Sequence, residues 1–384
     1  MRRFRGTSSL YHEDMHVRRG VAVVVLALGL GLAGCTGQGG PGVSTTGPGS
    51  GSPGGTTTVP TTPPVPTTLR DLPGAARVAI GTAINADLLR DPTYSALAAA
   101  QFNSVTAENA MKWERIEPVR GTYIWTQADQ LVAFAQANGQ TVRGHTLIWH
   151  NQVPSWLATT AAGLSDAEFA ALVKQHVLDE VTHFKGRIWQ WDVVNEAYDD
   201  SGKLRDTIFR QRLGDDYLAL IFGWAREADP GALLFYNDYG MEYGGAKTNA
   251  VLSMVQDFQK RGIPIDGVGF QAHYEASAPV PTSLPAVLKR FTDLGLKVAF
   301  TEMDVRGAAV DKKYGGAPDK TAQFYTTTLG ACLGAAACLS FTVWGISDKD
   351  SWVPYAFPGQ LSACLYDGKY QPNPWYADVA AALG

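Results

Sequence analysis

Short apolar runs alternate with longer amphipathic segments from Arg77 to the end of the chain. The runs are rich in β-branched and aromatic residues and end in polar or charged ones, which is typical of buried parallel strands. We predict eight strands, at residues 78–84, 104–106, 141–149, 188–194, 233–236, 268–272, 298–301 and 339–344. The amphipathic segments predict helices at residues 91–100, 126–138, 165–184, 215–228, 246–261, 282–294 and 319–333, and a last helix at 373–382.

Local sequence signals support these boundaries. Gly139, Gly262 and Gly295 each follow a predicted helix, where a left-handed residue ends the last turn. Ser165 and Glu168 have the pattern of a capping box at the start of the third helix. Eight strand–helix units in this order predict an α/β fold of the (β/α)8 TIM-barrel type with a single catalytic domain.

An open α/β sheet with an additional domain is the alternative architecture. No Gly-rich phosphate turn follows the first predicted strand, which disfavours a nucleotide-binding sheet. The composition does not change between Arg77 and Ala382, so the sequence marks no second domain there. The barrel is therefore the favoured prediction.

Residues 1–35 have the pattern of an export signal. Two arginines precede an apolar run at 21–32, which is too short to span a membrane comfortably and ends in small residues. The closing Leu-Ala-Gly-Cys resembles the lipobox of bacterial lipoproteins, in which the cysteine becomes the lipidated first residue. An ordinary secretory signal is the alternative, but the place of Cys35 at the end of the run favours lipidation. The long polar stretch before Met15 suggests that Met15 is the true start.

Residues 36–70 are rich in Gly, Ser, Thr and Pro, cannot bury a core and are expected to form a linker. The barrel domain is predicted at 71–384. A lipid on Cys35 followed by this tether implies an exported domain, extracellular or at the cell surface, held off a membrane. The net charge is −4 and no basic patch with interleaved aromatics occurs, so no nucleic-acid partner is expected. A monomer is expected.

Three further cysteines lie in the predicted domain. Exported chains meet oxidising conditions, in which disulfides form. Cys332 and Cys338 are six residues apart and are expected to close a small loop before the last strand, whereas Cys364 is expected to be buried as a small hydrophobic residue. No CxxC or HExxH spacing occurs, so neither a metal site nor another cofactor is expected.

The predicted strand ends carry the candidate chemistry. In a barrel these ends meet at one mouth, where barrel enzymes keep their active sites. Amides, lysine and histidine suit a ligand rich in hydroxyl groups, and indoles, of which the chain has ten, suit the apolar faces of sugar rings. The residues expected at the mouth are Glu108, Asn109, Lys112, His145, Trp149, His150, Gln152, Asn195, Glu196, Asn237, Asp238, Tyr239, Gln271, His273, Glu302, Asp304, Trp344 and Trp352.

Two carboxylates at a mouth suited to sugars indicate glycoside hydrolysis. Glu196 and Glu302 end the fourth and seventh predicted strands, on facing sides of the ring. One must be protonated while the other is ionised, so their surroundings must differ. Asn195 is placed to hold a sugar 2-hydroxyl, and His273 to orient an ionised Glu302 with support from Asp304.

Seven motifs at the strand ends resemble glycoside hydrolase family 10, the endo-β-1,4-xylanases. They are ENAMKWERIEP, RGHTLIWH with the Gln, Pro and Trp after it, WDVVNEA, YNDYG, FQAHY, TEMDV and VWGISDKDSW. The resemblance covers residues 77–382, essentially the whole predicted domain. Each motif alone is weakly specific, but their combination at every strand end is highly specific.

The resemblance implies a retaining double-displacement mechanism, with Glu196 as acid/base, Glu302 as nucleophile and His273 bonded to that nucleophile. Retention in turn requires carboxyl groups about 5–5.5 Å apart. Tyr239 matches an aromatic residue on the leaving-group side, and His150 with Asp192 match a supporting pair behind the site. The positions that match binding sites for xylose on the non-reducing side are Glu108, Asn109, Lys112, His145, Trp149, Gln152, Asn195, Gln271, Trp344 and Trp352.

The chain departs from the family pattern at two positions. Gly240 stands where the family usually has asparagine, which affects one leaving-side contact but not the chemistry, and Asn151 stands where serine is frequent. Other prominent residues are expected to be structural. Large aromatics in strands mostly pack, and histidines on a helix are mostly solvated or hydrogen-bonded. These residues are Trp113, Trp189, Trp191, His176 and His183.

The expected activity is hydrolysis of internal β-1,4 bonds of xylan. One alternative is a xylan-binding protein without catalysis, against which the presence of both Glu196 and Glu302 speaks. Another is a related retaining β-glycosidase acting on aryl xylosides or β-glucans. The sequence does not separate this second alternative, because one hydroxymethyl group at one subsite is selected by local shape.

Overall fold

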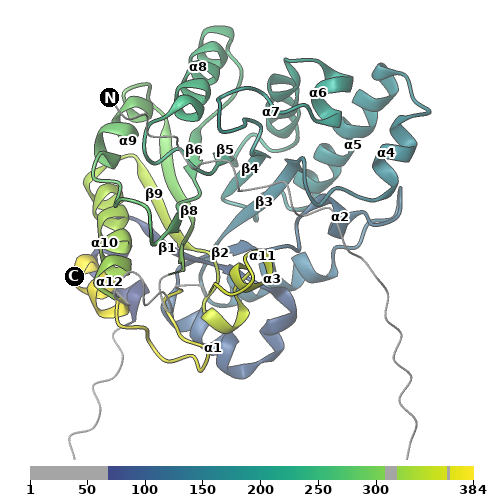
Figure 1. Cartoon of the computed structure of the whole chain (residues 1–384). Helices are drawn as coiled ribbons and strands as arrows, with labels where there is room; N and C mark the ends of the chain where they lie inside the picture. The colour runs from purple at the N-terminus through teal and green to yellow at the C-terminus, as the bar shows by residue number, and fades with distance from the viewer. Residues whose placement is uncertain (1–67, 308–317, 361–363) are drawn as a thin grey trace, which may run out of the picture. The chain divides into compact units, whose positions relative to one another are not determined.

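The computed structural model describes residues 68–307, 318–360 and 364–384. Their strands form a closed parallel barrel with helices outside it (Figure 1). Strands pair in chain order up to β6, which pairs with β8, and β9 then joins β8 to β1. The strands are β1 (Ala79–Ile84), β2 (Ser104–Ala107), β3 (Thr141–Trp149), β4 (Gln190–Asn195), β5 (Leu233–Asp238), β6 (Gly267–Phe270), β7 (His273–Glu275), β8 (Lys297–Arg306) and β9 (Cys338–Val343).

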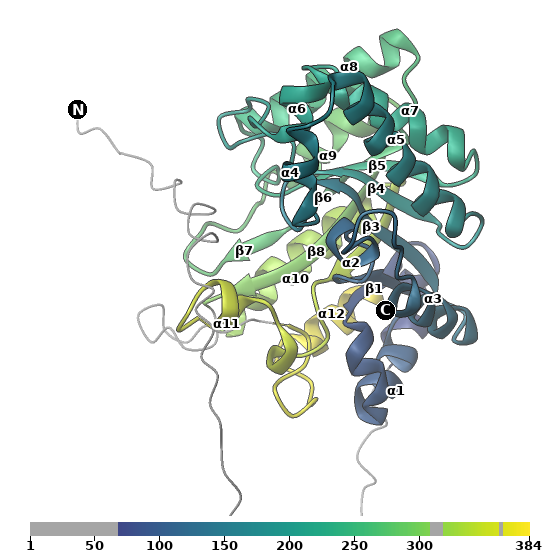
Figure 2. The ribbon, with the colours of Figure 1, turned by 90° about the vertical axis from the view of Figure 1, so that its right-hand side faces the viewer.

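Helices cover the outer face of the barrel. Helix α5 lies against β3 and beside α7, which contacts β4 and β5 (Figure 2). Helix α10 contacts β8, β9 and the C-terminal α12. The helices are α1 (Pro92–Gln101), α2 (Trp113–Ile116), α3 (Thr126–Ala137), α4 (Trp156–Ala161), α5 (Asp166–His183), α6 (Ile208–Leu213), α7 (Tyr217–Ala228), α8 (Ala246–Arg261), α9 (Leu284–Thr292), α10 (Pro318–Gly334), α11 (Val353–Ala356) and α12 (Tyr376–Leu383).

The predicted barrel is confirmed, and the open sheet is wrong because β6 pairs with β8 and closes the ring. The predicted strands and long helices agree with the structure to within three residues at most ends. Strand β8 is the main exception, since it continues to Arg306. The short helices α2, α4, α6 and α11 in the loops were not predicted. The capping box of α5 is present, with Ser165 and Glu168 each accepting the other's backbone N–H.

The sixth barrel strand is interrupted, in contrast to the continuous strand predicted at 268–272. Gln271, just after β6, still bonds to Asp238 of β5 and Glu302 of β8, and regular pairing resumes at β7 against the far end of β8. Between β6 and β7, Ala272 has a left-handed backbone with φ of 60°. Its N–H donates to the buried carboxylate of Glu242 over 2.7 Å. This contact satisfies a buried donor that a regular strand would have paired.

Large aromatic side chains pack between the barrel and α5. Trp191 of β4 is fully buried and contacts Phe184 at the end of that helix. A Cβ atom on Gly144 of β3 would lie 2.2 Å from the Trp191 ring, so glycine makes room for the indole. The predicted packing role is confirmed for Trp191 and for the buried Trp113, while Trp189 is half-buried.

The two histidines of α5 have structural partners, as predicted. The ring of His176 stacks on Trp113 with centroids 3.9 Å apart, and its Nε2 lies 3.0 Å from the Leu147 carbonyl oxygen. Burial lowers the pKa of His176 to about 3, so it is neutral. His183 contacts the carboxylate of Asp129 at 2.9 Å.

The barrel domain begins slightly before the predicted boundary at residue 71. Leu69 is buried, and its N–H donates to Gln101 Oε1 at the end of α1. Arg70 donates to the carbonyl oxygen of Ala99 at 2.7 Å and to that of Asn138 at 3.1 Å. Both residues, expected in the linker, are therefore docked on the domain. The predictions for residues 1–67, including Cys35, lie outside the described residues.

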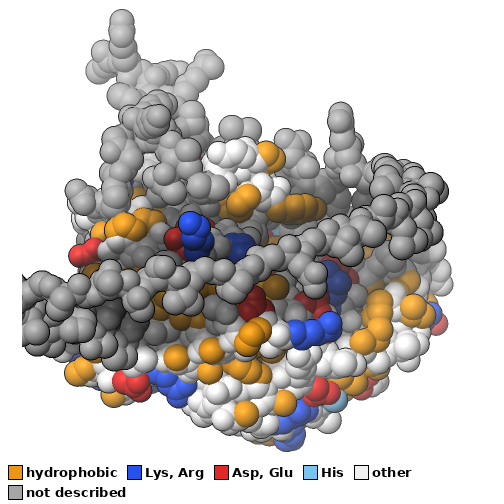
Figure 3. Space-filling model, turned by 90° about the horizontal axis from the view of Figure 1, so that it is seen from below, with side chains coloured by type: hydrophobic (Ala, Val, Ile, Leu, Met, Phe, Trp, Pro, Cys, Tyr) orange, Lys and Arg blue, Asp and Glu red, His pale blue; other side chains and the backbone are white. Residues whose placement is uncertain are grey.

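The predicted disulfide between Cys332 and Cys338 is present, and Cys364 is buried. The bridge joins the end of α10 to the start of β9. On the face shown in Figure 3, acidic and basic side chains lie among one another rather than in regions of one sign. Within the described ranges, no helix combines the length and apolar character that crossing a membrane requires.

Candidate active site

Glu196 follows β4 directly and is held in an unusual backbone conformation. Its φ is 57°, in the left-handed region, where a non-glycine residue costs on the order of 1–3 kcal/mol and often marks a functional site. The Glu196 N–H donates to the Asn237 carbonyl oxygen at 2.9 Å, and the Glu196 carbonyl accepts from Arg205 Nε at 3.1 Å. Its side chain is 5% exposed.

Three neutral N–H groups contact the Glu196 carboxyl group. Trp149 Nε1 donates to Oε2 at 2.9 Å. Gln271 Nε2 and Asn195 Nδ2 donate to Oε1 at 3.0 and 3.3 Å. These donors come from β3, the end of β6 and β4, so three neighbouring regions of the barrel fix one carboxyl group.

Glu302 lies within β8, and its carboxylate faces a charged donor. Its Oε2 lies 3.1 Å from His273 Nε2, and the other ring nitrogen of His273 lies 2.9 Å from Asp304. Burial lowers the pKa of His273, but Asp304 and Glu302 outweigh that effect and raise it to about 10. The ring is therefore an imidazolium that donates to both carboxylates. Asn237 Nδ2 donates to Glu302 Oε1 at 2.7 Å.

A row of side-chain amides connects the two glutamates. Asn195 Oδ1 accepts from Asn237 Nδ2 at 2.9 Å and from Gln271 Nε2 at 3.2 Å. Each of these amide nitrogens also donates to one glutamate, Asn237 to Glu302 and Gln271 to Glu196. The two carboxyl groups are therefore held in one rigid network rather than on independent side chains.

The orientation of Asn237 is fixed from inside the barrel. Its Oδ1 accepts from Thr301 Oγ1 at 2.8 Å and from Arg143 Nη2 at 3.4 Å, so its Nδ2 must face the site. Arg143 also donates to both oxygens of Asp192, and Oδ2 lies 2.9 Å from His145 Nδ1 as well. Burial would raise the pKa of Asp192, but Arg143 and His145 outweigh it and lower that pKa.

This arrangement corrects one expectation. Behind the site, Asp192 is supported by Arg143 and His145 rather than by His150. The physical reason is register: His145 pairs with Asp192 across β3 and β4, whereas His150 follows the end of β3. His150 instead lines a cavity of about 770 Å³ beside the loop that carries Arg205.

A second cluster gathers residues from the ends of β2 and β3. Lys112 Nζ donates to Asn109 Oδ1 at 3.0 Å and to Gln152 Oε1 at 2.6 Å, and lies 4.9 Å from the centre of the Trp149 ring. Burial lowers the pKa of Lys112, against the attraction of Glu302, Glu108 and Glu196. Burial likewise raises the pKa of Glu108, which Lys112 opposes. This cluster presents several polar groups suited to sugar hydroxyls.

Two indoles border His273 at the end of β9 and in the loop after it. Trp352 Nε1 donates to Asp304 Oδ2 at 2.7 Å, and its ring lies 5.0 Å from that of His273. Trp344 lies edge-on to both His273 and His145. The rings thus border the face of the site where His273 holds Glu302.

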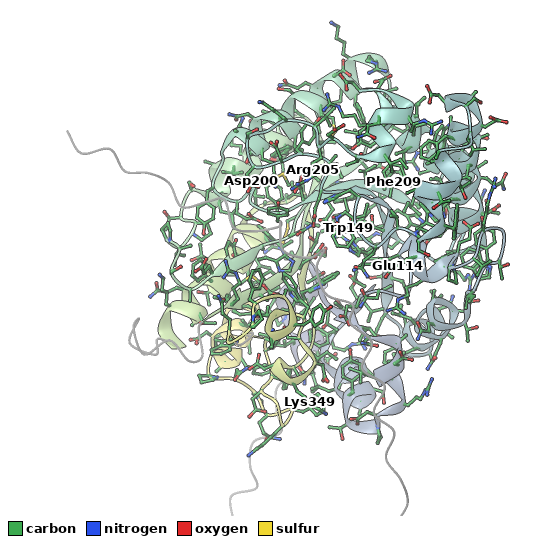
Figure 4. The ribbon with its side chains drawn as sticks, turned by 45° about the vertical axis from the view of Figure 1, so that its right-hand side comes forward. Glu114, Trp149, Asp200, Arg205, Phe209 and Lys349 are labelled. Atoms are coloured by element: carbon green, nitrogen blue, oxygen red, sulfur yellow. A yellow bond between two sulfur atoms is a disulfide. The ribbon has the colours of Figure 1, made fainter. Side chains whose placement is uncertain are left out.

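Tyr239 follows β5 directly. Its hydroxyl accepts from Arg205 Nη2 at 2.7 Å, and Lys247 Nζ lies 3.4 Å from its ring centre. Lys247 also pairs with Asp238 and Asp200. In Figure 4, Arg205 and Asp200 lie on one side of Trp149 and Lys349 on the other.

The predicted mouth residues lie near or beyond the carboxyl ends of the strands, except His145, which lies within β3 beside Asp192. Three supporting cations were not predicted. Arg143 and Lys247 look like ordinary buried or helical cations in the sequence, and Arg205 lies in a polar loop. Their partners are distant in the chain, so no local signal identifies them. Among the described residues, no three His, Cys, Asp or Glu side chains gather as metal ligands would.

The two glutamates have different surroundings, as a division of labour requires. Glu302 faces an imidazolium and one amide, whereas Glu196 accepts from the uncharged N–H groups of an indole and two amides. An ionised Glu302 can attack a carbon centre, and Glu196 can give a proton and take it back. Such a pair suits glycosidic bond cleavage in two displacement steps.

Comparison with known proteins gives a consistent picture. The family model described as glycosyl hydrolase family 10 matches residues 68–382. Endo-1,4-beta-xylanase 5 of Pyricularia oryzae is 41% identical over 284 residues, which are 74% of this chain and 69% of that protein. Endo-1,4-beta-xylanase B of Thermotoga neapolitana is 41% identical over 283 residues, 74% of this chain and 81% of that protein. The crystal structure of xylanase 10B from Thermotoga petrophila with xylobiose has a TM-score of 0.77 and 39% identity, covering 82% of this chain and 97% of its own.

Proposed function

Because the chain belongs to glycosyl hydrolase family 10, we propose that it is an endo-1,4-β-xylanase that cuts internal xylosidic bonds with retention of configuration. The relatives named as endo-1,4-beta-xylanases and the xylobiose complex support xylan or xylo-oligosaccharides as its substrate. The observation that carries the mechanism is the contrast between the two glutamates, one beside a cationic histidine and one beside neutral donors.

In the first step, Glu302 attacks the anomeric carbon while Glu196 gives its proton to the glycosidic oxygen. The carbon–oxygen bond breaks, the leaving chain departs as an alcohol, and a glycosyl ester forms on Glu302. In the second step, Glu196 takes a proton from water, whose oxygen attacks the same carbon and releases Glu302. Two inversions give net retention. The amide network fits this scheme because it keeps both carboxyl groups at fixed positions.

The remaining residues bind and orient. His273 fixes the carboxylate plane of Glu302, with Asp304 keeping the imidazole charged. Asn195, between the glutamates, is placed to contact a sugar 2-hydroxyl, a contact that can strengthen in the transition state. Xylose units on the non-reducing side would be held by Glu108, Asn109, Lys112, His145, Trp149, Gln152, Gln271, Trp344 and Trp352. Tyr239 would contact the sugar on the leaving side.

Two substitutions test the assignment of roles. Glu302→Ala should abolish hydrolysis of xylan and of activated aryl glycosides, because both need the nucleophile. Glu196→Ala should slow xylan hydrolysis by about 10²–10⁴-fold, yet largely spare the kcat/KM of aryl glycosides with good leaving groups, which need little proton assistance. Wild-type activity on xylan in both variants would refute the assignment. NMR of the first product should show the retained anomer.

The substrate class needs its own measurement. The product profile on purified xylan and on cellulose separates internal from terminal cutting and identifies the sugar. Short xylo-oligosaccharides formed early from xylan, with cellulose left intact, are the expected outcome. Efficient cutting of a β-glucan or only of aryl xylosides would instead identify the related β-glycosidase, and binding without any cleavage would identify a catalytically silent xylan-binding protein.

We further propose that the enzyme is exported as residues 35–384, a monomer, with a lipid on Cys35 as its first residue and residues 36 to about 67 as its tether. The support is the basic, apolar and small-residue order before Cys35 and the charge-free linker after it. Labelled palmitate should enter the wild type and be lost in Cys35→Ala. Equal labelling of both proteins would remove the anchor from the proposal.

A further inference from the structure

Arg205 contacts both the proton donor and the leaving-side aromatic residue. It lies in the loop between β4 and α6, and its own N–H donates to the Ala197 carbonyl oxygen at 2.8 Å. Its Nε donates to the Glu196 carbonyl oxygen at 3.1 Å, and its Nη2 donates to the Tyr239 hydroxyl at 2.7 Å. A single planar guanidinium thus joins two parts of the site at fixed angles.

The first contact bears on the direction of the Glu196 side chain. Its left-handed backbone, with φ of 57°, turns the chain sharply at the end of β4. The peptide group before Glu196 is held by the Asn237 carbonyl, and the peptide group after it is held by Arg205. Fixing both peptide groups fixes the backbone rotations about the Glu196 Cα atom, and so the direction in which its side chain leaves the backbone.

The second contact fixes Tyr239. Burial raises the pKa of Tyr239 to about 12, against the effect of Lys247 and Arg205, so the phenol is neutral. Arg205 holds the phenol oxygen, while Lys247 lies over the ring and is itself paired with Asp238 and Asp200. Contacts at the hydroxyl group and at the ring face therefore hold the Tyr239 side chain in one orientation.

We propose that Arg205 is a positioning residue for proton transfer, which couples the leaving-side contact at Tyr239 to the orientation of Glu196. This inference rests on the proposed acid/base role of Glu196. Arg205 does not touch the reacting atoms, so it acts only through those two residues. When a leaving-side sugar settles against Tyr239, the guanidinium keeps the Glu196 carboxyl group aligned with the glycosidic oxygen that needs the proton.

The test compares Arg205→Met and Arg205→Lys on aryl xylobiosides whose leaving groups range from dinitrophenol to unsubstituted phenol. In Arg205→Met, kcat/KM for the phenyl glycoside should fall about 10- to 100-fold, a partial loss of general-acid catalysis, whereas the dinitrophenyl glycoside should change less than about threefold. A steeper dependence of kcat/KM on leaving-group pKa is the expected signature. Arg205→Lys keeps a cation but loses the planar guanidinium that makes both contacts. Its dependence of kcat/KM on leaving-group pKa should lie between those of wild type and Arg205→Met.

Arg210→Met is the matched control. Arg210 belongs to the same region and donates to the Leu204 carbonyl oxygen and to Asp215, and neither of these contacts involves Glu196 or Tyr239. Arg210→Met should leave the dependence of kcat/KM on leaving-group pKa unchanged. A purely structural role of Arg205 would slow all aryl glycosides equally, and that result, or an unchanged slope in both Arg205 variants, would overturn the proposal. If Arg205→Met does not fold, the slope in Arg205→Lys decides.

A double-mutant cycle with Tyr239→Phe tests the coupling. If Arg205 acts partly through the Tyr239 hydroxyl, the two substitutions should be non-additive on the phenyl glycoside. Additive effects would limit the role of Arg205 to Glu196 and refute the coupling. These measurements use aryl glycosides, so a wild type that leaves xylan uncut would contradict the proposed substrate and not the role of Arg205.

Discussion

His273 lies between two carboxylates, and its charge governs the surroundings of Glu302. One ring nitrogen contacts Asp304 and the other contacts Glu302, at 2.9 and 3.1 Å. Burial by itself would favour the neutral ring, but the two carboxylates raise the pKa of His273 from 6.5 to about 10. The histidine therefore remains charged across the neutral range, unlike an ordinary exposed histidine.

This shift predicts how stability depends on pH. The folded pKa lies above the unfolded pKa, so the contribution of His273 is complete below pH 6.5 and declines as pH rises toward 10. The decline amounts to at most roughly 5 kcal/mol, because one pKa unit corresponds to about 1.4 kcal/mol. Denaturant unfolding at pH 6 and pH 9 should show wild type losing more stability than His273→Gln, which keeps a neutral donor. Equal losses in the two proteins would contradict the charged histidine.

The site residues that could be predicted are those whose chemistry coincides with the end of a predicted strand. Glu196, Glu302, His273 and Asp304 were predicted together because each ends a recognisable strand. Arg205 was not, since its partners are a carbonyl oxygen and a phenol brought close only by folding. The pairing of Asp192 with His145 rather than His150 likewise depends on the register between β3 and β4, which periodicity does not specify.

Between elements, the contact of β3 with β4 depends on a glycine. Gly144 lies opposite Trp191 in the register of the two strands, and the indole occupies the space that a side chain would need. Trp191 is fully buried against Phe184 of α5, so it has little room to move. A side chain at position 144 would therefore disturb the packing of Trp191 between the barrel and α5.

We predict that Gly144→Ala lowers the free energy of unfolding by about 3 kcal/mol or more, because overpacking forces Trp191 and the strand apart. Gly223→Ala is the matched control: Gly223 lies inside α7, and a Cβ atom there would meet nothing within 4 Å. That substitution should stabilise the protein by about 0.5–1 kcal/mol through helix propensity. Denaturant unfolding measures both. If Gly144→Ala lowered the free energy of unfolding by less than about 1 kcal/mol, Trp191 would have to repack at little cost.

The elements themselves were largely predictable, except where a distant contact replaces a local signal. Apolar periodicity and glycine stops predicted the strands and long helices. The break between β6 and β7 was not predicted, because the residues there, Gln271 and Ala272, are neither glycine nor proline. Ala272 adopts its left-handed conformation with the help of Glu242, which is 30 residues away. The extension of β8 was missed because charged residues alternate with apolar ones over its last five positions, yet all five are buried.

For the whole domain, the segment before β1 ties the two ends of the chain together. Leu69 and Tyr376 of α12 both donate to the same Gln101 oxygen, from opposite ends of the domain. Arg70 holds carbonyl oxygens at the ends of α1 and α3. A Cβ atom on Gly74 would lie 2.9 Å from Leu383, so this segment also packs closely on the C-terminal helix.

This arrangement predicts where the chain can be shortened. All the proposed site residues lie within 67–384, so a protein starting at Thr67 should match the full chain in melting temperature and kcat/KM. A protein starting at Val78 should lose about 2.5–6 kcal/mol, since it gives up the burial of Leu69, about 1.5–3 kcal/mol, and the two hydrogen bonds of Arg70, about 0.5–1.5 kcal/mol each.

Leu69→Ala in the longer protein separates the two contributions. It removes most of the buried side chain but keeps the Arg70 contacts and the Leu69 N–H, so its loss should fall short of that in the protein starting at Val78. Thermal unfolding with kcat/KM at 25 °C gives stability and activity for each protein. Because the segment packs on α1, α12 and β1 rather than at the mouth, the destabilised proteins should keep wild-type kcat/KM below their melting temperatures. Equal melting temperatures for proteins starting at Thr67 and Val78 would show that the docked segment adds nothing to the barrel.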